Sequence, residues 1–248
     1  MKLFSVQNLI PPDGWRLRVV EETDSTNDHI FRLAQEGEPE GLVLIARSQS
    51  QGKGSRGRSF FSPEGGIYLS VLLRDTAPEL LSVLTPLAAV ALLEALRPHT
   101  EKTLAIKWVN DIYLENKKLC GILSETKYMG ESRLSVVGVG INLAPPEGGY
   151  PADFLHPAAA LLSFPDAAVA EQIINTFLSR LKALTEAGVL PSAYKENCCT
   201  IGKEITLRRG TEILYGTALD ITEEGALLVR MEDGSIRPFT SGEVTSQI

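Results

Sequence analysis

The feature that most constrains this chain is a short loop of three glycines and three cations at residues 52–58, directly after an apolar run at residues 41–46. The loop reads Gly-Lys-Gly-Ser-Arg-Gly-Arg. A strand that ends in such a loop brings bare backbone N–H groups and positive side chains to one point. Such a point is typical of a binding site for phosphate or carboxylate groups.

Two common nucleotide-binding loops do not fit this segment. A P-loop needs Ser or Thr after its lysine and a glycine at its start, whereas here Gly54 follows Lys53 and Arg47 occupies the first position. A Rossmann fingerprint has the right glycine spacing, but residues 58–62 do not open an apolar helix. Taken alone, the loop therefore fits an ordinary surface turn as well as a binding loop.

Three further blocks follow in the sequence, namely Lys-Trp-Val-Asn-Asp at 107–111, Lys-Leu-Cys-Gly-Ile-Leu at 118–123 and Gly-Val-Gly-Ile-Asn at 138–142. Two of them have a plain structural interpretation. The first fits a salt-bridged β-turn, and the third fits a strand that passes close to another backbone. A fourth block, at residues 23–27, precedes a helical pattern, and its Ser25 or Thr26 is well placed as an N-cap.

Taken together and in this order, these blocks resemble the class I biotin–protein ligases, also called biotin–acetyl-CoA-carboxylase ligases. The likeness extends from residue 23 to the C-terminus. The resemblance implies that biotin and MgATP give biotinyl-5′-AMP and pyrophosphate, and that a lysine of a biotin carboxyl carrier protein or domain then takes the biotin as an amide. Biotin, ATP and Mg²⁺ are therefore the expected ligands, and the carrier of a biotin-dependent carboxylase is the expected partner.

The resemblance also assigns site residues. The biotin pocket is expected to contain Ser25, Thr26, Asn27, Gln49, Lys53, Gly54, Ser55, Lys118 and Gly121. The nucleotide site is expected to contain Arg56, Gly57, Arg58, Phe60, Asn110 and Asn142. The expected catalytic residues are Lys118, Lys53 and Lys107, because joining a carboxylate to an α-phosphate brings anions together and needs fixed positive charge. Asp111, beside Asn110, is expected to hold Mg²⁺ directly or through water, since this ion prefers oxygen ligands.

Four positions depart from the usual family pattern. Lys53 replaces the first arginine of the glycine loop. Ser55 replaces the second arginine of a Gly-Arg-Gly-Arg loop, which is credited with holding the activated acyl phosphate, and a serine hydroxyl cannot replace a bidentate donor. Val109 replaces a proline, which changes loop stiffness but not charge. Phe60 replaces a tryptophan and keeps an aromatic face. The candidates to compensate for the lost arginine are Arg56, Arg58 and Lys53.

Hydrophobic periodicity predicts an α+β domain at residues 1–199. The expected strands are 41–47, 67–73, 104–108, 112–114, 119–126 and 133–141, and the expected helices follow residue 25 and span 78–96 and 167–187. Short strands separated by glycine turns, at 205–208, 213–221, 226–231 and 236–239, predict a small all-β domain at 200–248. The resemblance implies a mixed β-sheet with flanking helices, like that of class II aminoacyl-tRNA synthetases and biotin synthetase, followed by an SH3-like barrel.

Composition limits the function classes. The formal net charge of −7 is the opposite of the footprint of a nucleic-acid-binding protein. Only about twenty residues precede residue 23, too few for the helix-turn-helix domain of the larger family members, so no DNA binding is expected. The three cysteines spell out no disulfide framework, and the three histidines have no zinc spacing. With no secretory signal and no stretch that reaches a membrane span, we expect a cytoplasmic protein and allow for a homodimer.

Two other functions stay open at the level of sequence. A lipoate–protein ligase or octanoyltransferase would share the fold and activate a carboxylate similarly, although the blocks around Gly52 and Lys107 favour biotin. A biotin-binding regulatory protein with weakened catalysis is a rival of another class, and Ser55 is the residue that supports it. Pyrophosphate release from ATP in the presence of biotin, lipoate or octanoate separates the three.

Overall fold

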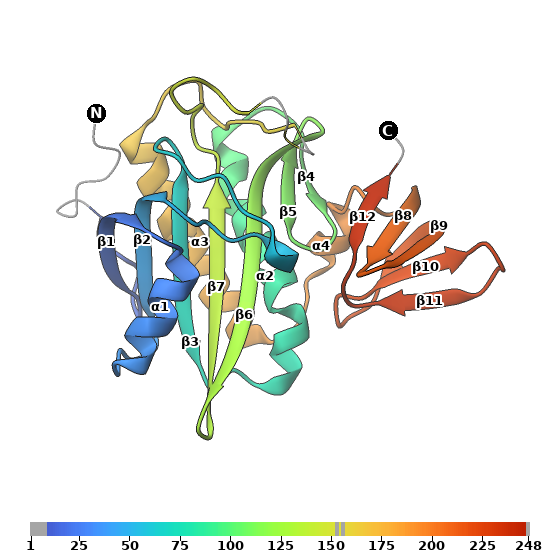
Figure 1. Ribbon diagram of the computed structural model, residues 1–248, viewed down its shortest axis with the longest axis horizontal. Coiled ribbons are helices and arrows are strands. Elements are labelled where there is room, and N and C mark those ends of the chain that lie inside the picture. The colour runs from blue at the N-terminus through green and yellow to red at the C-terminus, as the bar shows by residue number, and fades with distance from the viewer. Residues whose placement is uncertain (1–8, 152–153, 155–156, 247–248) are drawn as a thin grey trace.

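The computed structural model of the chain describes residues 9–151, 154 and 157–246. Seven strands form a mixed sheet in the order β1-β2-β3-β7-β6-β5-β4 (Figure 1). They are β1 (Arg16–Thr23), β2 (Leu42–Gln49), β3 (Ile67–Arg74), β4 (Leu104–Lys107), β5 (Asp111–Leu114), β6 (Lys117–Met129) and β7 (Ser132–Ile141). β1 and β2 pair in parallel, and the other neighbours are antiparallel.

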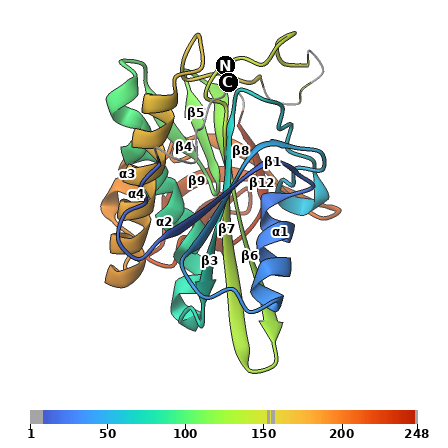
Figure 2. The same cartoon turned by 90° about the vertical axis from the view of Figure 1, so that its left-hand side faces the viewer.

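Helices cover both faces of this sheet (Figure 2). They are α1 (Thr26–Gln35) on one face, and α2 (Pro78–Leu96), α3 (Ala167–Ala187) and the short α4 (Ser192–Glu196) on the other. The alternation of side chains along a strand explains the two layers. Leu42 and Leu44 of β2 pack with α1, whereas Val43 and Ile45 belong to the core formed with α2 and α3. Both faces are buried, which fits the apolar sequence of this strand.

The ends of α3 follow from its sequence. The Asp166 carboxylate accepts the backbone N–H groups of Ala168 and Val169 (2.9 and 3.1 Å), and so caps the helix. The helix ends at Gly188, whose φ of 70° favours glycine. Its bounds are those predicted from the sequence.

The helix α2 is the central core helix. It begins with Pro78, whose missing N–H is one of those left unpaired in any first turn. By length and composition, the stretch Pro78–His99 could cross a membrane, whereas the sequence analysis predicted no stretch that reaches a membrane span. However, 67% of its most apolar window is buried, as expected of a helix packed between a sheet and α3.

A second, antiparallel sheet follows, in the order β11-β10-β9-β8-β12. Its strands are β8 (Glu204–Arg209), β9 (Glu212–Ile221), β10 (Leu227–Met231), β11 (Ile236–Phe239) and β12 (Glu243–Ser246). Among the described residues no pairing joins β11 to β12, so the sheet does not close, and the predicted SH3-like barrel is wrong in this respect. β11 contains Pro238, which lacks an N–H donor and is therefore suited to a sheet edge.

The two sheets are joined at Trp108, which is buried. Its indole N–H donates to the Gly225 carbonyl (3.0 Å), just before β10, and its backbone N–H donates to the Thr200 hydroxyl (3.1 Å). Lys195 of α4 adds an ion pair with Asp220 of β9 (3.1 Å). Because buried polar groups need partners, these bonds fix the second sheet against the first.

We predict that Trp108→Phe and Trp15→Phe each lower the free energy of unfolding by about 1–3 kcal/mol, through a lost hydrogen bond and partly emptied space. The Trp15 indole donates to the Leu178 carbonyl (3.2 Å) within the first domain and so serves as a matched control. Urea unfolding measures both losses. Only Trp108→Phe should increase amide exchange in β9 and β10, and equal exchange in the two variants would contradict the proposed junction.

Candidate functional site

The glycine loop crosses β6 and β7 on the α1 face of the large sheet (Figure 1). A pocket lies at this crossing. Of the predicted site residues, Arg56 and Gly57 are not in its lining. The predicted residues that line it are Ser25, Thr26, Asn27, Gln49, Lys53, Gly54, Ser55, Arg58, Phe60, Lys107, Asn110, Asp111, Lys118, Gly121 and Asn142. The fold therefore brings blocks that are far apart in the sequence to one place.

Glycines form the floor of this pocket. Gly138 and Gly140 lie on the same face of β7 as Val136, which packs under α1. A Cβ atom at Gly138 would overlap the Oδ1 atom of Asn27, and one at Gly140 would overlap the ring of Phe60. The sequence interpretation of a close backbone crossing is therefore wrong here, because these glycines make room for side chains of the site.

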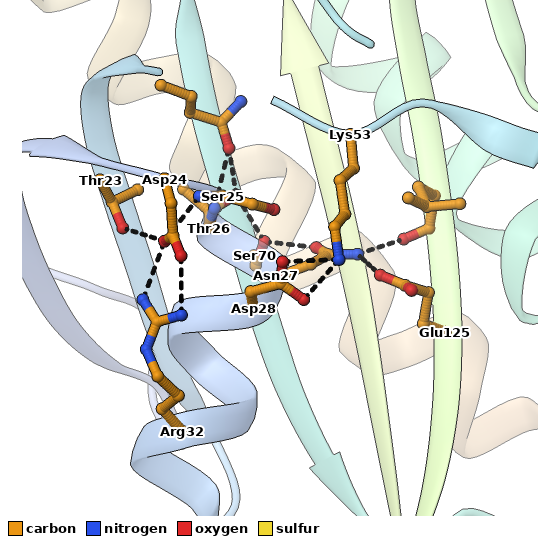
Figure 3. A network of polar contacts seen from close by, with 12 residues as sticks. Thr23, Asp24, Ser25, Thr26, Asn27, Asp28, Arg32, Lys53, Ser70 and Glu125 are labelled. Atoms are coloured by element: carbon orange, nitrogen blue, oxygen red, sulfur yellow. Dashed lines mark hydrogen bonds and ion pairs between the residues drawn. The ribbon is translucent and has the colours of Figure 1, made fainter. Parts of the chain in front are cut away.

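The polar end of the pocket is built at the start of α1 (Figure 3). Ser70, buried on β3, donates to Asn27 Oδ1 (2.6 Å) and lies 2.7 Å from Thr26 Oγ1. The Asn27 Nδ2 group donates to the Leu123 carbonyl (3.2 Å) and to Glu125 Oε2 (2.7 Å). With its oxygen and its nitrogen both bonded, the Asn27 side chain is held in one orientation.

Gln49 of β2 closes the same end of the pocket. Its Oε1 accepts the Thr26 backbone N–H (2.8 Å), and its Nε2 donates to the Ser62 hydroxyl (2.8 Å). The first N–H groups of a helix have no partner within the helix. Ser25 is the N-cap by position, as predicted, but its side chain makes no cap bond. Gln49, at the end of β2, accepts the helix N–H in its place.

The glycine loop folds back on itself over the floor. The Gly54 N–H donates to the Arg58 carbonyl (2.7 Å), and the Phe60 N–H donates to the Gly52 carbonyl (2.7 Å). A side chain at Gly52 would overlap the Phe60 carbonyl, so the tight return requires glycine there. This return places the Phe60 ring against Gly140.

Two arginines tie the loop to the second sheet. Arg58 Nη1 pairs with Glu243 Oε1 of β12 (2.6 Å), and both residues line the pocket. Arg56 has a left-handed backbone (φ 62°), and its side chain donates to the Arg208 carbonyl of β8 (2.9 Å). Arg56 is therefore turned towards the second sheet. A nucleotide contact by Arg56 or Gly57 stays a prediction.

Two of the predicted catalytic lysines share one wall of the pocket. Lys118 Nζ pairs with Asp111 Oδ1 (2.7 Å) and lies 5.8 Å from the centre of the Phe60 ring. Lys107 Nζ lies 3.4 Å from the Tyr113 hydroxyl. Burial lowers the pKa of Lys107, and the nearby Asp111 carboxylate opposes that shift. The wall therefore presents two amines beside one carboxylate.

Several residues of the site environment escaped the sequence analysis, among them Ser70, Glu243 and Asp28. Asp28 pairs with Lys53, the third predicted catalytic lysine, at 2.5 Å. A serine within an apolar strand was a usable signal for Ser70, because a buried hydroxyl needs a polar partner. The contacts of Asp28 and Glu243 join elements far apart in the chain, and the local sequence carried no signal for them.

The pocket offers few metal ligands. Among the described residues, no group of three or more His, Cys, Asp or Glu side chains could hold a metal ion. Asp111 supplies one carboxylate, and the Asn110 amide donates its N–H to the Ile122 carbonyl (2.9 Å), which leaves the amide oxygen available. Mg²⁺ commonly takes one or two carboxylates together with substrate phosphates and water. The residues therefore fit an Mg²⁺ that arrives on a phosphate ligand.

Comparison with known proteins identifies relatives of this chain. Residues 19–142 match the Biotin/lipoate A/B protein ligase family, and residues 200–245 match the Biotin protein ligase C terminal domain. The bifunctional ligase/repressor BirA of Escherichia coli is 31% identical over 242 residues, which cover 94% of this chain and 74% of that protein. The biotin–[acetyl-CoA-carboxylase] ligase of Paracoccus denitrificans is 32% identical over 224 residues, which cover 86% of this chain and 93% of that protein.

A solved structure resembles the whole arrangement. The biotin protein ligase from Aquifex aeolicus, in complex with biotin and ATP, has a TM-score of 0.77 and 28% sequence identity. The match covers 94% of this chain and 98% of that one. At this coverage, the likeness includes both sheets and the segment that connects them.

We predict that Gly138→Ala lowers the free energy of unfolding by about 1–3 kcal/mol, because the new methyl group overlaps an Asn27 side chain that is held by hydrogen bonds. In an Asn27→Ala background the same change should have a much smaller effect, since the obstructing atoms are gone. Urea unfolding of the wild type, both single variants and the double variant measures the difference. Additive effects would show that Asn27 is not the obstacle.

Proposed function

The chain belongs to the biotin/lipoate A/B protein ligase family, and we propose that the pocket over β6 and β7 is where it joins biotin to ATP. The chain is an ATP-dependent biotin ligase: it activates biotin to biotinyl-5′-AMP and transfers the biotin to a lysine of a carrier protein. One observation carries the placement of this chemistry. A single pocket unites a preset polar end at α1 with a wall of lysines.

In this proposal, the ureido ring of biotin occupies the polar end of the pocket. A ureido group has N–H donors and a carbonyl acceptor, and hydroxyl and amide side chains match both. Ser25, Thr26, Asn27 and Gln49 supply such groups there. Gly54 and Gly121 allow the backbone to approach the ligand closely. The biotin carboxylate then extends towards Lys118.

The first step is the attack of a biotin carboxylate oxygen on the α-phosphorus of ATP, with pyrophosphate as the leaving group. Both reactants are anions, so fixed positive charge stabilises the transition state. Lys118 and Lys107 provide it from the wall, and Arg58 is the arginine of the loop that lines the pocket. Phe60 offers an aromatic surface to the adenylate, and Asn110 and Asn142 offer amides to the nucleotide.

In the second step, the amine of the carrier lysine attacks the acyl carbon of biotinyl-5′-AMP, and AMP leaves. An acyl adenylate reacts with water, so the site must exclude solvent between the steps. The folded glycine loop is suited to this, because it lies directly over the pocket floor. Mg²⁺, bound with ATP, would neutralise phosphate charge, and Asp111 would hold it directly or through water.

Other expectations remain proposals from the sequence. The two family matches support a division into residues 1–199 and 200–248. Cytoplasmic location, homodimer formation and the lack of DNA binding rest on composition and resemblance alone. The same is true of the likeness to class II synthetases.

Pyrophosphate release tests the proposed function. We predict release from MgATP with biotin, and little release with lipoate or octanoate, since the biotin ligases are the relatives of this chain. Lys118→Ala should lower the biotin-dependent rate by about 10²–10³ while the melting temperature changes little. Release with lipoate but not biotin would favour the lipoate ligase. Biotin binding without any release would favour the regulatory protein.

We predict that Ser55→Arg speeds carrier biotinylation and reduces stray labelling, because it adds a preorganised donor to the adenylate. Losing such a donor can cost on the order of 10²–10³ in rate, but Arg58 also lines the pocket and should reduce the difference to about tenfold. Wild type and variant are compared with carrier protein and an excess of serum albumin. Ser50→Arg, which adds the same charge outside the pocket lining, is the control. Equal rates and equally clean labelling would mean that the loop already compensates.

A further inference from the structure

An ion pair connects the glycine loop to α1 at the edge of the polar end (Figure 3). The Lys53 ammonium lies 2.6 and 2.5 Å from the two carboxylate oxygens of Asp28, in the first turn of the helix. A carboxylate is favourable in a first turn, where the helix dipole is positive. Asp28 directly follows Asn27, so the pair starts beside a residue that lines the pocket.

The surroundings of Lys53 keep its ammonium charged and directed towards α1. Asp28, Glu125 and Asp24 all raise the pKa of Lys53, and the hydrogen bond to Asp28 has the largest effect. Glu125 accepts a hydrogen bond from Asn27 (2.7 Å), and Asp24 is held by Arg32 (2.8 Å). These two acids are therefore bonded to other side chains, and Asp28 is the close partner of Lys53.

The backbone of Lys53 transmits this attachment to the pocket. Lys53 forms an isolated bridge with Ser59, and the adjoining Phe60 N–H bonds to the Gly52 carbonyl (2.7 Å). The Phe60 ring lies against the glycine floor. Lys53 therefore links Asp28 to the start of the loop, directly above the pocket floor.

Asp28 itself is not in the lining of the pocket, whereas Lys53 is. A substrate can therefore enter without displacing the carboxylate. By contrast, the partners of the other cations, Asp111 for Lys118 and Glu243 for Arg58, both line the pocket. This difference favours a structural attachment at Asp28 over competition with an anionic substrate.

We propose that Asp28 is a positioning residue, which holds the glycine loop over the biotin end of the pocket through Lys53. The proposal rests on the function proposed above. The opposite end of the loop is attached separately, by the hydrogen bond from Arg56 to the Arg208 carbonyl outside the pocket lining and by the pair of Arg58 with Glu243. Loss of the Asp28 carboxylate should therefore loosen the biotin end while the nucleotide end stays in place.

The first test needs no catalysis. In the protein without substrates, Asp28→Asn should increase amide exchange at residues 52–55 severalfold, and in a Lys53→Met background it should add nothing further. Glu38→Gln is the matched control, because it breaks a comparable exposed ion pair with Arg18 away from the pocket. Unchanged exchange in Asp28→Asn, or an equal increase in the control, would overturn the proposal.

The second test is a comparison of Michaelis constants in the pyrophosphate assay. For Asp28→Asn we expect the KM for biotin to rise about three- to fivefold, the range for a partly exposed ion pair, while the KM for ATP changes less than about twofold. Asp28→Glu, which keeps the charge, should recover most of the loss and also serves if Asp28→Asn folds poorly. A lower KM for biotin would show competition, and equal rises for both substrates would show a general disturbance; either result overturns the proposal. A wild type without biotin-dependent release would instead refute the proposed function.

Discussion

The contact between the glycine floor and the side chains above it is the constraint on which the site depends. The antiparallel register of β6 and β7 pairs Gly121 with Gly140, so two glycines lie side by side under the Phe60 ring. Gly138 leaves space for Asn27 in the same way. Further along the same face, Leu134 and Val136 pack under α1. The pocket exists because this face of β6 and β7 carries large side chains under α1 and only glycines under the Phe60 ring.

The second sheet is part of the same construction. It reaches the wall of the pocket through Trp108, which adjoins Lys107, and it reaches the loop through Glu243. A buried indole without an acceptor would be costly, so the Gly225 carbonyl secures both the sheet and the strand that carries the lysine. The small domain thus helps to position the wall and the loop. It also contributes Gly242, Glu243 and Val244 to the pocket lining.

Much of the fold could be predicted from the sequence, because α2 is a long apolar segment and α3 a long amphipathic one, and their bounds agree with the prediction. The charged edge strand β1 was missed because exposed positions interrupt its pattern. The cap from Gln49 and the hydroxyl of Ser70 depend on contacts between distant segments, which periodicity does not encode. The order of the motifs was enough to predict which residues meet in the pocket. It could not predict the direction of Arg56 towards the second sheet, which depends on a left-handed backbone at a non-glycine residue.

The charges of the pocket also explain how an acidic protein can hold a cationic site. The chain has a net charge of −7, and Lys53, Lys118 and Arg58 each pair with a carboxylate. A cation that loses part of its hydration without gaining a partner is destabilised, and the paired carboxylates compensate for that loss. When an anion enters the pocket, its oxygens can replace those of Asp111 and Glu243, which line the same space. Lys118 and Arg58 then exchange one oxygen anion for another and keep a partner throughout. The positive charge is therefore in place before the reaction begins.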